Sequence, residues 1–561
     1  MTKYLNLAFI LVILSSALAF ADDKKVSKDI NEMNDNDESD VIVQFIRPPT
    51  AIELSALGGQ KKLFANSKHA LIHMTAGMAK RLANNTNVRY ASPDRKLNKT
   101  LEFANPGVYA DFAFNSGWTG AGVGVAVIDS GIFDSPDFNS STCTGSRIVY
   151  RANFVVGETT TGDTYGHGTH VAGIIGGNSK CAATGMTRQF RGIAPAVNII
   201  SLRALNAQGS GTDSAVISAI DAAVALKNTY NIRVLNLSLG HGVYESYTLD
   251  PLCMAVERAW KAGIVVVVSA GNMGRYAATG GYGMISSPGN DPFVITVGAA
   301  NDKKTITRVD DIIASYSSKG PTLVDHVVKP DLVAPGNIIM SIQSPGSTLS
   351  TTLAAQIPMQ SYYTSTGNSI PSTAYMKMSG TSMAAPMVAG AAALLIQKTP
   401  GLTPNQVKAR LMKTASKTFP TTMTVYERQT NTTYTMYKDA FTIGAGYLDV
   451  TAALANGDLI QTPATTPLSP RVALNNLTRR LSLITANSLV WGDNVVWGDN
   501  VVWGDSLVWG DTTIFGSTLV WGDTSTSANG LVWGDSMIAR QSLIWGDSLS
   551  KSNLTEIVDE L

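Results

Sequence analysis

The sequence predicts an α/β fold, with a doubly wound, mostly parallel sheet and helices on both of its faces. The first observation behind this prediction is a series of short, continuously apolar runs at residues 123–128, 197–202, 234–239, 264–268 and 293–297. Strands buried on both faces have this pattern, whereas a strand with one face in solvent alternates apolar and polar residues. The second observation is that helical patterns separate the runs, at residues 212–226, 252–261 and 383–397. Strands that alternate with helices in this way form parallel sheets.

The composition describes a globular protein. The chain has 561 residues, of which 44% are hydrophobic and 15% charged, so it can bury a large core and does not have the profile of a disordered chain. Its 43 Lys and Arg almost balance its 42 Asp and Glu, giving a formal net charge of +1. No overall field therefore recruits nucleic acid or an anionic membrane, and we expect no nucleic-acid partner.

Residues 1–21 have the layout of a secretory signal peptide. Lys3 precedes an apolar run from Leu5 to Leu14, and the stretch Ser15-Ser16-Ala17-Leu18-Ala19, rich in small residues, follows it. Cleavage after Ala19 or Ala21 fits this pattern. The run is shorter than the ~20 apolar residues of a membrane-spanning helix, and no later segment reaches that length, so we expect no transmembrane span. The sequence therefore predicts a secreted protein, extracellular or associated with the cell envelope.

The three cysteines do not form a scaffold. Cys143, Cys181 and Cys253 are too few to staple a chain of this length, and no neighbouring residues complete a zinc site around them. We expect at most one disulfide and one free thiol.

Changes in pattern divide the chain into segments. Residues 41–94 combine an alternating strand with two helical and two further strand patterns, which predicts a small α+β domain. The predicted order is a signal peptide (1–21), a polar acidic segment (22–40), the small domain (41–94), a linker (95–106), the large α/β domain (107–455), a Thr/Pro-rich linker (456–486), a repeat region (487–547) and a C-terminal tail (548–561).

The repeat region is built from hexads. Trp-Gly-Asp recurs seven times at intervals of six or twelve residues, from Trp491 to Trp545. A period of six is even, so in an extended chain every tryptophan lies on the same face. We predict a low-complexity, β-type array, with a disordered extension as the alternative. The partner of this tail is unknown.

Two titratable residues stand where an α/β fold opens onto a crevice. Asp129 ends the first buried strand, and the carboxyl ends of parallel strands border the ligand site. His167 opens a helix in Gly166-His167-Gly168-Thr169-His170. For Asp129 the alternatives are a carboxylate that binds a ribose, as in Rossmann-like folds, and a polar strand cap without function. For the two histidines the alternatives are a zinc pair, which lacks a third ligand and a glutamate base, and structural packing, which we prefer for His170.

Two further residues complete a set of catalytic groups. Ser382 lies at a helix start in Ser379-Gly380-Thr381-Ser382-Met383, with its backbone N–H directed toward developing negative charge. Asn272 follows a buried strand and can donate to an oxyanion. A helix cap and a turn are the alternatives for these residues taken singly. Together the four residues supply an orienting carboxylate, a base, a nucleophile and an oxyanion donor.

The motifs that carry these residues resemble those of the subtilisin-like serine proteases, the subtilase family. Three strings in the order Asp, His, Ser match the family: Val127-Ile128-Asp129-Ser130-Gly131, His167-Gly168-Thr169-His170-Val171-Ala172-Gly173 and Gly380-Thr381-Ser382-Met383-Ala384-Ala385-Pro386. The resemblance extends from about Trp118 to Val450. Departures from the minimal pattern are a polar insertion between Ser341 and Thr373, a Thr/Tyr-rich segment at 418–442 and the hexad tail.

The resemblance implies a serine endopeptidase that works through an acyl-enzyme. It implies two substrate walls that pair with an extended peptide, formed by Gly209, Ser210 and Gly211 and by Ser238, Leu239 and Gly240. It also implies that residues 41–94 are a propeptide that acts as an intramolecular inhibitor in a self-processed precursor. The chemistry requires no cofactor; structural calcium is common in the family, but the sequence assigns no metal ligands.

One segment of the sequence bears on substrate choice, and the position of the tail bears on its role. No acidic residue lies between Met273 and Asn290, so we expect protein or peptide substrates with an apolar or broad preference rather than a basic one. We also expect truncation after Pro463 to leave peptidase activity intact. Two other functions are alternatives to peptidase activity. The first is that of a surface binding or adhesive protein that acts through its repeat tail, and the second is that of a zinc hydrolase that uses His167 and His170.

Overall fold

The computed structural model describes residues 25–26, 30–31, 33–57, 59–63, 68–93, 104–183, 185–365, 369–427, 431–459, 465–475, 480–484 and 513–514. The predicted signal peptide and almost all of the hexad region lie outside these residues. The chain forms two compact units, residues 1–98 and 99–561. No helix of the described part of the chain is long and apolar enough to cross a membrane.

The first unit is a four-stranded antiparallel sheet with two helices. Its elements are β1 (Glu38–Phe45), α3 (Ala51–Ser55), β2 (Gly59–Leu63), β3 (His69–Thr75), α4 (Ala76–Arg81) and β4 (Val88–Pro93), and the strand order is β2-β3-β1-β4. This is a split βαβ arrangement. Val26 and Ile30, upstream of the predicted boundary at residue 41, are buried in its core.

The second unit contains an eight-stranded sheet. Seven strands follow the order β11-β10-β9-β8-β5-β7-β6, and β12 pairs with β10. All pairs are parallel except that between β10 and β11. The strands are β5 (Gly124–Asp129), β6 (Ile148–Asn153), β7 (Asn198–Arg203), β8 (Ile232–Leu237), β9 (Val265–Ser269), β10 (Ile295–Asn301), β11 (Ile312–Ile313) and β12 (Leu332–Pro335).

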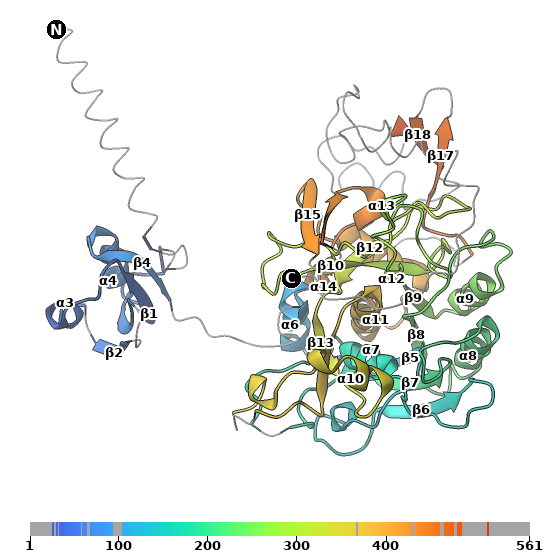
Figure 1. Cartoon of the computed structure of the whole chain (residues 1–561), viewed down its shortest axis with the longest axis horizontal. Helices are drawn as coiled ribbons and strands as arrows, with labels where there is room; N and C mark the ends of the chain where they lie inside the picture. Colours follow the sequence, from blue (N-terminus) through green and yellow to red (C-terminus); the bar gives the residue numbers. More distant parts are fainter. Residues whose placement is uncertain are drawn as a thin grey trace, which may run out of the picture. The chain divides into compact units, whose positions relative to one another are not determined.

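Four of the helices lie beside this sheet and pack against each other in two pairs (Figure 1). Helix α7 (His167–Gly176) packs on α11 (Thr381–Lys398), and α8 (Asp213–Ala225) packs on α9 (Pro251–Lys261). Every residue of β5, β9 and β10 is buried. Both faces of a strand are buried in this way only when both faces of the sheet are covered. The predicted mostly parallel α/β sheet is therefore confirmed.

Smaller elements complete the second unit. The remaining helices are α5 (Ala104–Gly107), α6 (Ala110–Asn115), α10 (Thr348–Thr352), α12 (Pro404–Thr414), α13 (Ala440–Ile443) and α14 (Val450–Ala455). Strands β13 (Ile339–Ile342) and β14 (Tyr375–Met378) form one pair, and β15 (Thr422–Glu427) and β16 (Thr432–Tyr437) form another. The polar insertion thus contains α10, and the Thr/Tyr-rich segment is a β-hairpin that buries alternate residues of β15.

The structure shows the cysteine pairing and the packing of residues 465–475, neither of which the sequence predicts. Cys143 and Cys181 form a disulfide, and Cys253 is a buried free thiol, within the limit expected from the composition. Residues 465–475, which the sequence places in a linker, pack on the second unit, where Leu468 and Ser469 are buried. The segment ends in β17 (Arg471–Asn475), which pairs with β18 (Arg480–Ile484), and β19 (Thr513–Ile514) pairs with β18.

Candidate active site

Four predicted residues come from the ends of core elements. Asp129 is the last residue of β5, and His167 is the first residue of α7. Asn272 follows β9 by three residues, and Ser382 is the second residue of α11. Helices α7 and α11 pack against each other, and β8, which pairs with both β5 and β9, packs on α11.

Asp129 and His167 are directly hydrogen-bonded. The Nδ1 atom of His167 lies 2.8 Å from Oδ1 and 3.0 Å from Oδ2 of Asp129. An ionised carboxylate only accepts hydrogen bonds, so Nδ1 carries the proton and Nε2 is left as the basic nitrogen. The Asp129 side chain is 1% exposed and that of His167 is 12% exposed. The carboxylate is thus fixed in the core while one edge of the imidazole reaches the surface.

A second buried carboxylate holds the start of α7. Asp163 accepts hydrogen bonds from the backbone N–H groups of Gly166 (2.6 Å) and Thr169 (2.8 Å) and from the hydroxyls of Thr169 (2.6 Å) and Ser130 (2.8 Å). These contacts satisfy N–H groups that a helix start leaves without partners. The left-handed φ of +104° at Gly166 allows the sharp entry into the helix.

The environment of His167 favours its charged form. Burial alone lowers the pKa of His167, but the negative charge of Asp129, the hydrogen bond to it and the charge of Asp163 outweigh burial and raise the pKa above its usual value. Asp163 is itself desolvated, and burial raises the pKa of its carboxyl despite four hydrogen bonds. The imidazole is therefore a stronger base than a solvated histidine.

Ser382 is bonded to the neighbouring wall of the site. Its hydroxyl donates to the carbonyl of Ser238 at 3.2 Å, and the Ser238 hydroxyl donates to the carbonyl of Ser382 at 2.9 Å. The Asn236 amide, fully buried, donates to the Ser238 hydroxyl at 3.0 Å. The start of α11 is thus tied to the end of β8. The Ser382 hydroxyl is therefore directed at the carbonyl of Ser238.

Asn272 is oriented by a residue that the sequence analysis did not single out. The backbone N–H and the hydroxyl of Thr381 both donate to Oδ1 of Asn272, at 2.9 and 3.0 Å. The same hydroxyl accepts from the N–H of Gly271 at 3.1 Å. Two donors on one atom of the Asn272 amide identify that atom as the oxygen. The other atom is therefore Nδ2, which can donate to a reacting group.

The two predicted substrate walls lie in segments next to core strands. Gly209, Ser210 and Gly211 lie in a turn in which Asn206 bonds Ser210 and Leu205 pairs with Gly211. A Cβ at Gly209 would lie 2.5 Å from the ring of Tyr165, so the wall lies directly against that ring. Ser238, Leu239 and Gly240 continue from β8, and a Cβ at Gly240 would lie 2.4 Å from the carbonyl of Ser287.

Comparison with known proteins decides the family. Residues 120–446, more than half of the chain, match the model of the subtilase family. The chain belongs to this family. The subtilase is 38% identical to serine protease AprX of Bacillus subtilis over 60% of this chain and 71% of that protein, and 35% identical to subtilisin DY of Bacillus licheniformis over 57% and 92%. A crystal structure of a cold adapted subtilisin-like serine proteinase matches 53% of this chain and 84% of that chain, with 32% identity and a TM-score of 0.38.

Membership of the family shows that this chain is a serine endopeptidase. The family match begins before Asp129 and ends after Ser382, so it spans all four catalytic candidates. The residues that the sequence analysis missed are Asp163 and Thr381. The available signals were their positions, since Asp163 lies four residues before His167 and Thr381 lies directly before Ser382 in the same motif.

The second histidine of the subtilase is structural. His170 is fully buried, and its Nε2 lies 3.0 Å from the carbonyl of Ile339 and 3.2 Å from that of Met376. Burial and the neighbouring His167 lower the pKa of His170 to about 3, so it stays neutral. These contacts support the structural interpretation over a zinc pair. Among the residues that the structure describes, no group of three or more His, Cys, Asp or Glu side chains is arranged to hold a metal ion.

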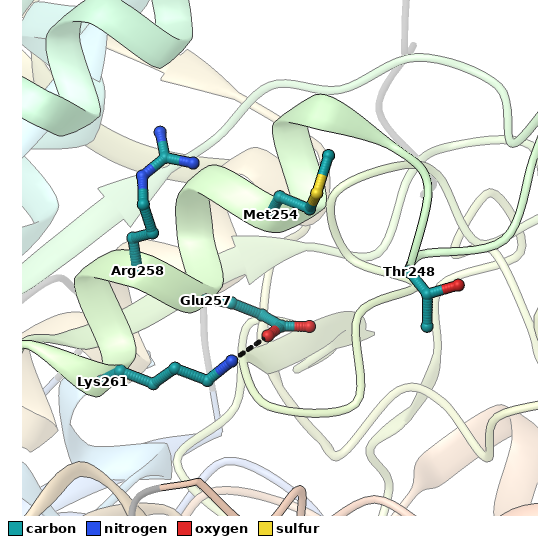
Figure 2. Close-up of a pocket in the computed structure, with 5 residues that line it drawn as sticks. All are labelled: Thr248, Met254, Glu257, Arg258 and Lys261. Carbon is teal, nitrogen blue, oxygen red and sulfur yellow. Dashed lines mark hydrogen bonds and ion pairs between the residues drawn. The ribbon is translucent and has the colours of Figure 1, made fainter.

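A separate pocket lies along α9. Thr248, Met254, Glu257, Arg258 and Lys261 line it, and Figure 2 shows the ion pair between Glu257 and Lys261 on one side. None of these residues belongs to the predicted catalytic set or to the substrate walls of the subtilase. We assign the pocket no role in catalysis.

Proposed function

We propose that this subtilase is an exported endopeptidase in which Ser382 is the nucleophile and His167 is the general base. Asp129 orients the imidazole and stabilises it when it becomes charged. Asn272 and the backbone N–H of Ser382 receive the oxyanion. The observation that carries these assignments is the pair of short contacts between Nδ1 of His167 and the buried carboxylate of Asp129, because this bond fixes the tautomer that a general base needs.

The reaction proceeds by acyl transfer. The Ser382 hydroxyl turns from the Ser238 carbonyl, gives its proton to Nε2 of His167 and attacks the peptide carbonyl carbon. Negative charge moves onto the carbonyl oxygen, where Nδ2 of Asn272 and the Ser382 N–H donate to it. The Ser382 N–H is one of the first N–H groups of α11 and has no acceptor within the helix. His167 then protonates the leaving amine, and water releases the acyl group.

Substrate binds as an added strand. Gly209, Ser210 and Gly211 on one side and Ser238, Leu239 and Gly240 on the other present backbone groups to an extended peptide. The ring of Tyr165 lies directly against Gly209 of the first wall. We propose protein or peptide substrates with an apolar or broad preference, since the segment from Met273 to Asn290 carries no carboxylate.

The chain is made as a precursor. Residues 1–21 direct export, and residues 41–94 act as an intramolecular inhibitor until the linker at 95–106 is cut by the enzyme itself. Support comes from the split βαβ unit upstream of the subtilase domain, since a folded unit with a C-terminal strand can offer that strand to the substrate walls. The catalytic chemistry requires no cofactor, and bound calcium would be structural.

Two inhibitors and one variant test this proposal on the purified protein. A fluorophosphonate should label one serine and abolish turnover, whereas a chelator should leave the chemistry intact. Ser382→Ala should lose both labelling and turnover, while Ser341→Ala, which removes a fully buried serine hydroxyl elsewhere, should keep both. Inhibition by the chelator without labelling would favour a zinc hydrolase. A folded protein with neither response would favour a binding or adhesive function of the hexad tail.

A further inference from the structure

Arg203 is a buried cation beside the catalytic carboxylate. It is the last residue of β7, where its backbone pairs with Asp129 of β5 on one side and with Asn153 of β6 on the other. Its side chain is 0% exposed. Burying a guanidinium costs free energy unless all of its N–H donors find acceptors. The acceptors around Arg203 therefore identify the segments that its side chain holds together.

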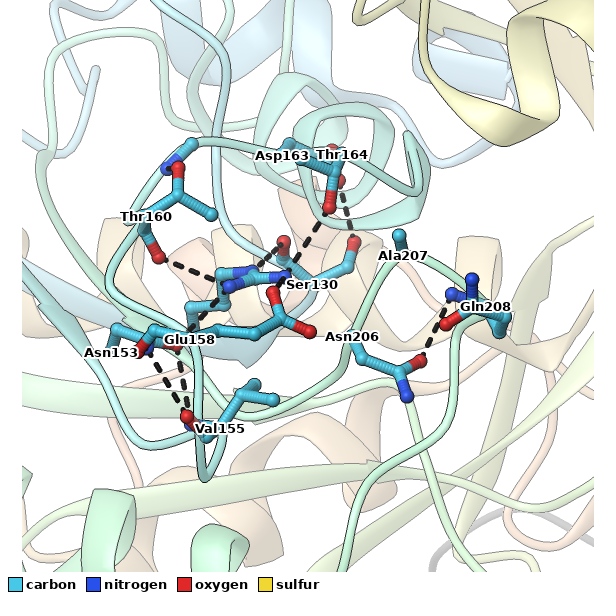
Figure 3. Close-up of polar contacts among 12 residues, drawn as sticks. Ser130, Asn153, Val155, Glu158, Thr160, Asp163, Thr164, Asn206, Ala207 and Gln208 are labelled. Carbon is cyan, nitrogen blue, oxygen red and sulfur yellow. Dashed lines mark hydrogen bonds and ion pairs between the residues drawn. The ribbon is translucent and has the colours of Figure 1, made fainter.

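The guanidinium joins three segments of chain. Its Nε donates to the carbonyl of Ser130 at 3.2 Å, directly after Asp129. Its other nitrogens donate to acceptors at the end of β6 and in the segment that follows it: Asn153 Oδ1 at 3.3 Å, Glu158 Oε2 at 2.5 Å, Thr160 O at 3.0 Å and Thr164 Oγ1 at 3.3 Å. Figure 3 shows these four acceptor residues together with Ser130 and Asp163.

The same contacts reach both members of the Asp129 and His167 pair. Ser130, held by Arg203 through its carbonyl, donates its hydroxyl to Asp163 at 2.8 Å and accepts from the N–H of Gly168 at 2.9 Å. Asp163 in turn fixes the N–H groups on either side of His167. A shift of the Ser130 carbonyl would therefore move the strand end that carries Asp129 relative to the helix start that carries His167.

We propose that Arg203, with Glu158 as its counter-ion, is a positioning residue that sets the geometry of the hydrogen bond between Asp129 and His167. Glu158 is 34% exposed and provides the only carboxylate bonded to the guanidinium among the described residues. The fork of Arg203 crosslinks the loop and the strand end as a single unit, which a point charge cannot do. This role rests on the proposed function of Asp129 and His167, and it concerns residues outside that catalytic set.

Three variants and a matched control test the proposal in the full chain. Arg203→Met removes all the donors and keeps an apolar side chain, Arg203→Lys keeps the charge without the fork, and Glu158→Gln removes the counter-charge. Arg308→Met is the control, because Arg308 is also buried and bonds two carbonyls and one carboxylate, those of Gly107, Leu448 and Asp449, away from Asp129.

The first readout is kinetic and is normalised to the concentration of folded protein. Arg203→Met should lower kcat on the order of a hundredfold with little change in KM, since a misplacement of about 1 Å in a catalytic group has an effect of that size. Arg203→Lys should recover part of the loss, and Glu158→Gln should lie between Arg203→Lys and the unaltered enzyme. Arg308→Met should lower stability but leave kcat within about threefold of the unaltered enzyme.

The second readout separates this proposal from the proposed function. The proton that His167 Nδ1 shares with Asp129 lies in a short hydrogen bond and should give a downfield NMR resonance, which can be followed whether or not the protein hydrolyses peptides. The resonance should shift or broaden in Arg203→Met and persist in Arg308→Met. An unaltered protein without turnover would overturn the proposed function, whereas an unchanged resonance in Arg203→Met, or a kcat equal to that of Arg308→Met, would overturn the role of Arg203.

Discussion

Ser469 is expected to stabilise the subtilase domain from outside the family match, which ends at residue 446. It lies against a fully buried cluster in which the carboxylate of Asp331 is shared by two lysines, Lys329 at 2.7 Å and Lys408 at 3.1 Å. The Ser469 hydroxyl donates to Oδ1 of Asp331 at 2.5 Å and accepts from Nζ of Lys408 at 2.7 Å. Ser469→Ala therefore removes one hydrogen bond from a buried anion and one from a buried cation.

The size of the effect follows from these two bonds. A hydrogen bond to a charged group contributes about 1.5–3 kcal/mol, and losing it leaves a desolvated charge short of a partner. Because the two bonds share one network, their losses do not add fully, and we expect Ser469→Ala to lower the free energy of unfolding by about 3 kcal/mol. Ser341→Ala removes a fully buried hydroxyl that donates to the uncharged carbonyl of His170, so it should cost only about 1 kcal/mol.

Truncation should have a larger effect than the point variant. A chain that ends at Pro463 loses Ser469 together with Leu468, which is 0% exposed, and Val472, which is 4% exposed. Burial of each of these apolar side chains stabilises the fold by roughly 1.5–3 kcal/mol. The combined loss is comparable to the ~5–15 kcal/mol stability of a whole domain. We therefore expect this truncation to lose activity through unfolding, contrary to the expectation from the sequence, and a chain ending at Asn475 to keep more of it.

The assay is equilibrium unfolding in urea, followed by circular dichroism. Every variant carries Ser382→Ala as well, so that no unfolded chain is digested by its neighbours. The two serine variants are compared with each other, and the two truncations with the full chain. Equal losses for Ser469→Ala and Ser341→Ala, or equal stabilities for chains ending at Pro463 and Asn475, would refute the assignment of residues 465–475 to the folded domain.

Three further predictions concern the chemistry. Ser382→Ala should abolish turnover while leaving the protein folded, with a loss on the order of a millionfold in kcat as in subtilisins, and Asn272→Ala should cost about a hundred- to a thousandfold; near-wild-type rates would contradict either assignment. The activity of the enzyme should fall as the pH drops through the raised pKa of His167, because the imidazolium cannot accept a proton. Asp163→Asn removes a negative charge that favours the imidazolium, so it should lower the pKa of His167 and move the acid limb of the kcat/KM profile to lower pH. A Ser382→Ala precursor expressed without other proteases should remain uncut between residues 95 and 106, and trimming at the same place would exclude self-processing.

Much of the fold was predictable because its signals are local. The five strands predicted in the large domain coincide with β5, β7, β8, β9 and β10 to within a few residues, and the three helices predicted there coincide with α8, α9 and α11. Continuous β-branched runs and amphipathic helices are properties of adjacent residues, and they specify elements before any tertiary contact forms. Strand β2 (Gly59–Leu63) was not predicted, because the polar residues Gln60 and Lys61 give it no apolar alternation.

The candidate catalytic residues were found in the sequence for a similar reason. Asp129, His167, Asn272 and Ser382 stand at strand ends and helix starts, and the topology of a parallel sheet brings such positions to one edge. The residues that orient them could not be found in this way. Asp163, Thr381 and Arg203 act through hydrogen bonds to segments distant in sequence, and only the packed chain brings those donors and acceptors together.

The sequence by itself determined the class of the fold and pointed to the catalytic candidates, because each depends on a local pattern or motif. Tertiary structure decided which cysteines pair, that the Ser382 hydroxyl bonds to the Ser238 carbonyl, and that Leu468 and Ser469 are buried. Ser469 shows the reason most clearly. Nothing in the Thr/Pro-rich composition around Ser469 predicts that it is buried. Its hydroxyl stabilises the domain only because folding brings Asp331 and Lys408 from two other segments to within hydrogen-bonding distance of it.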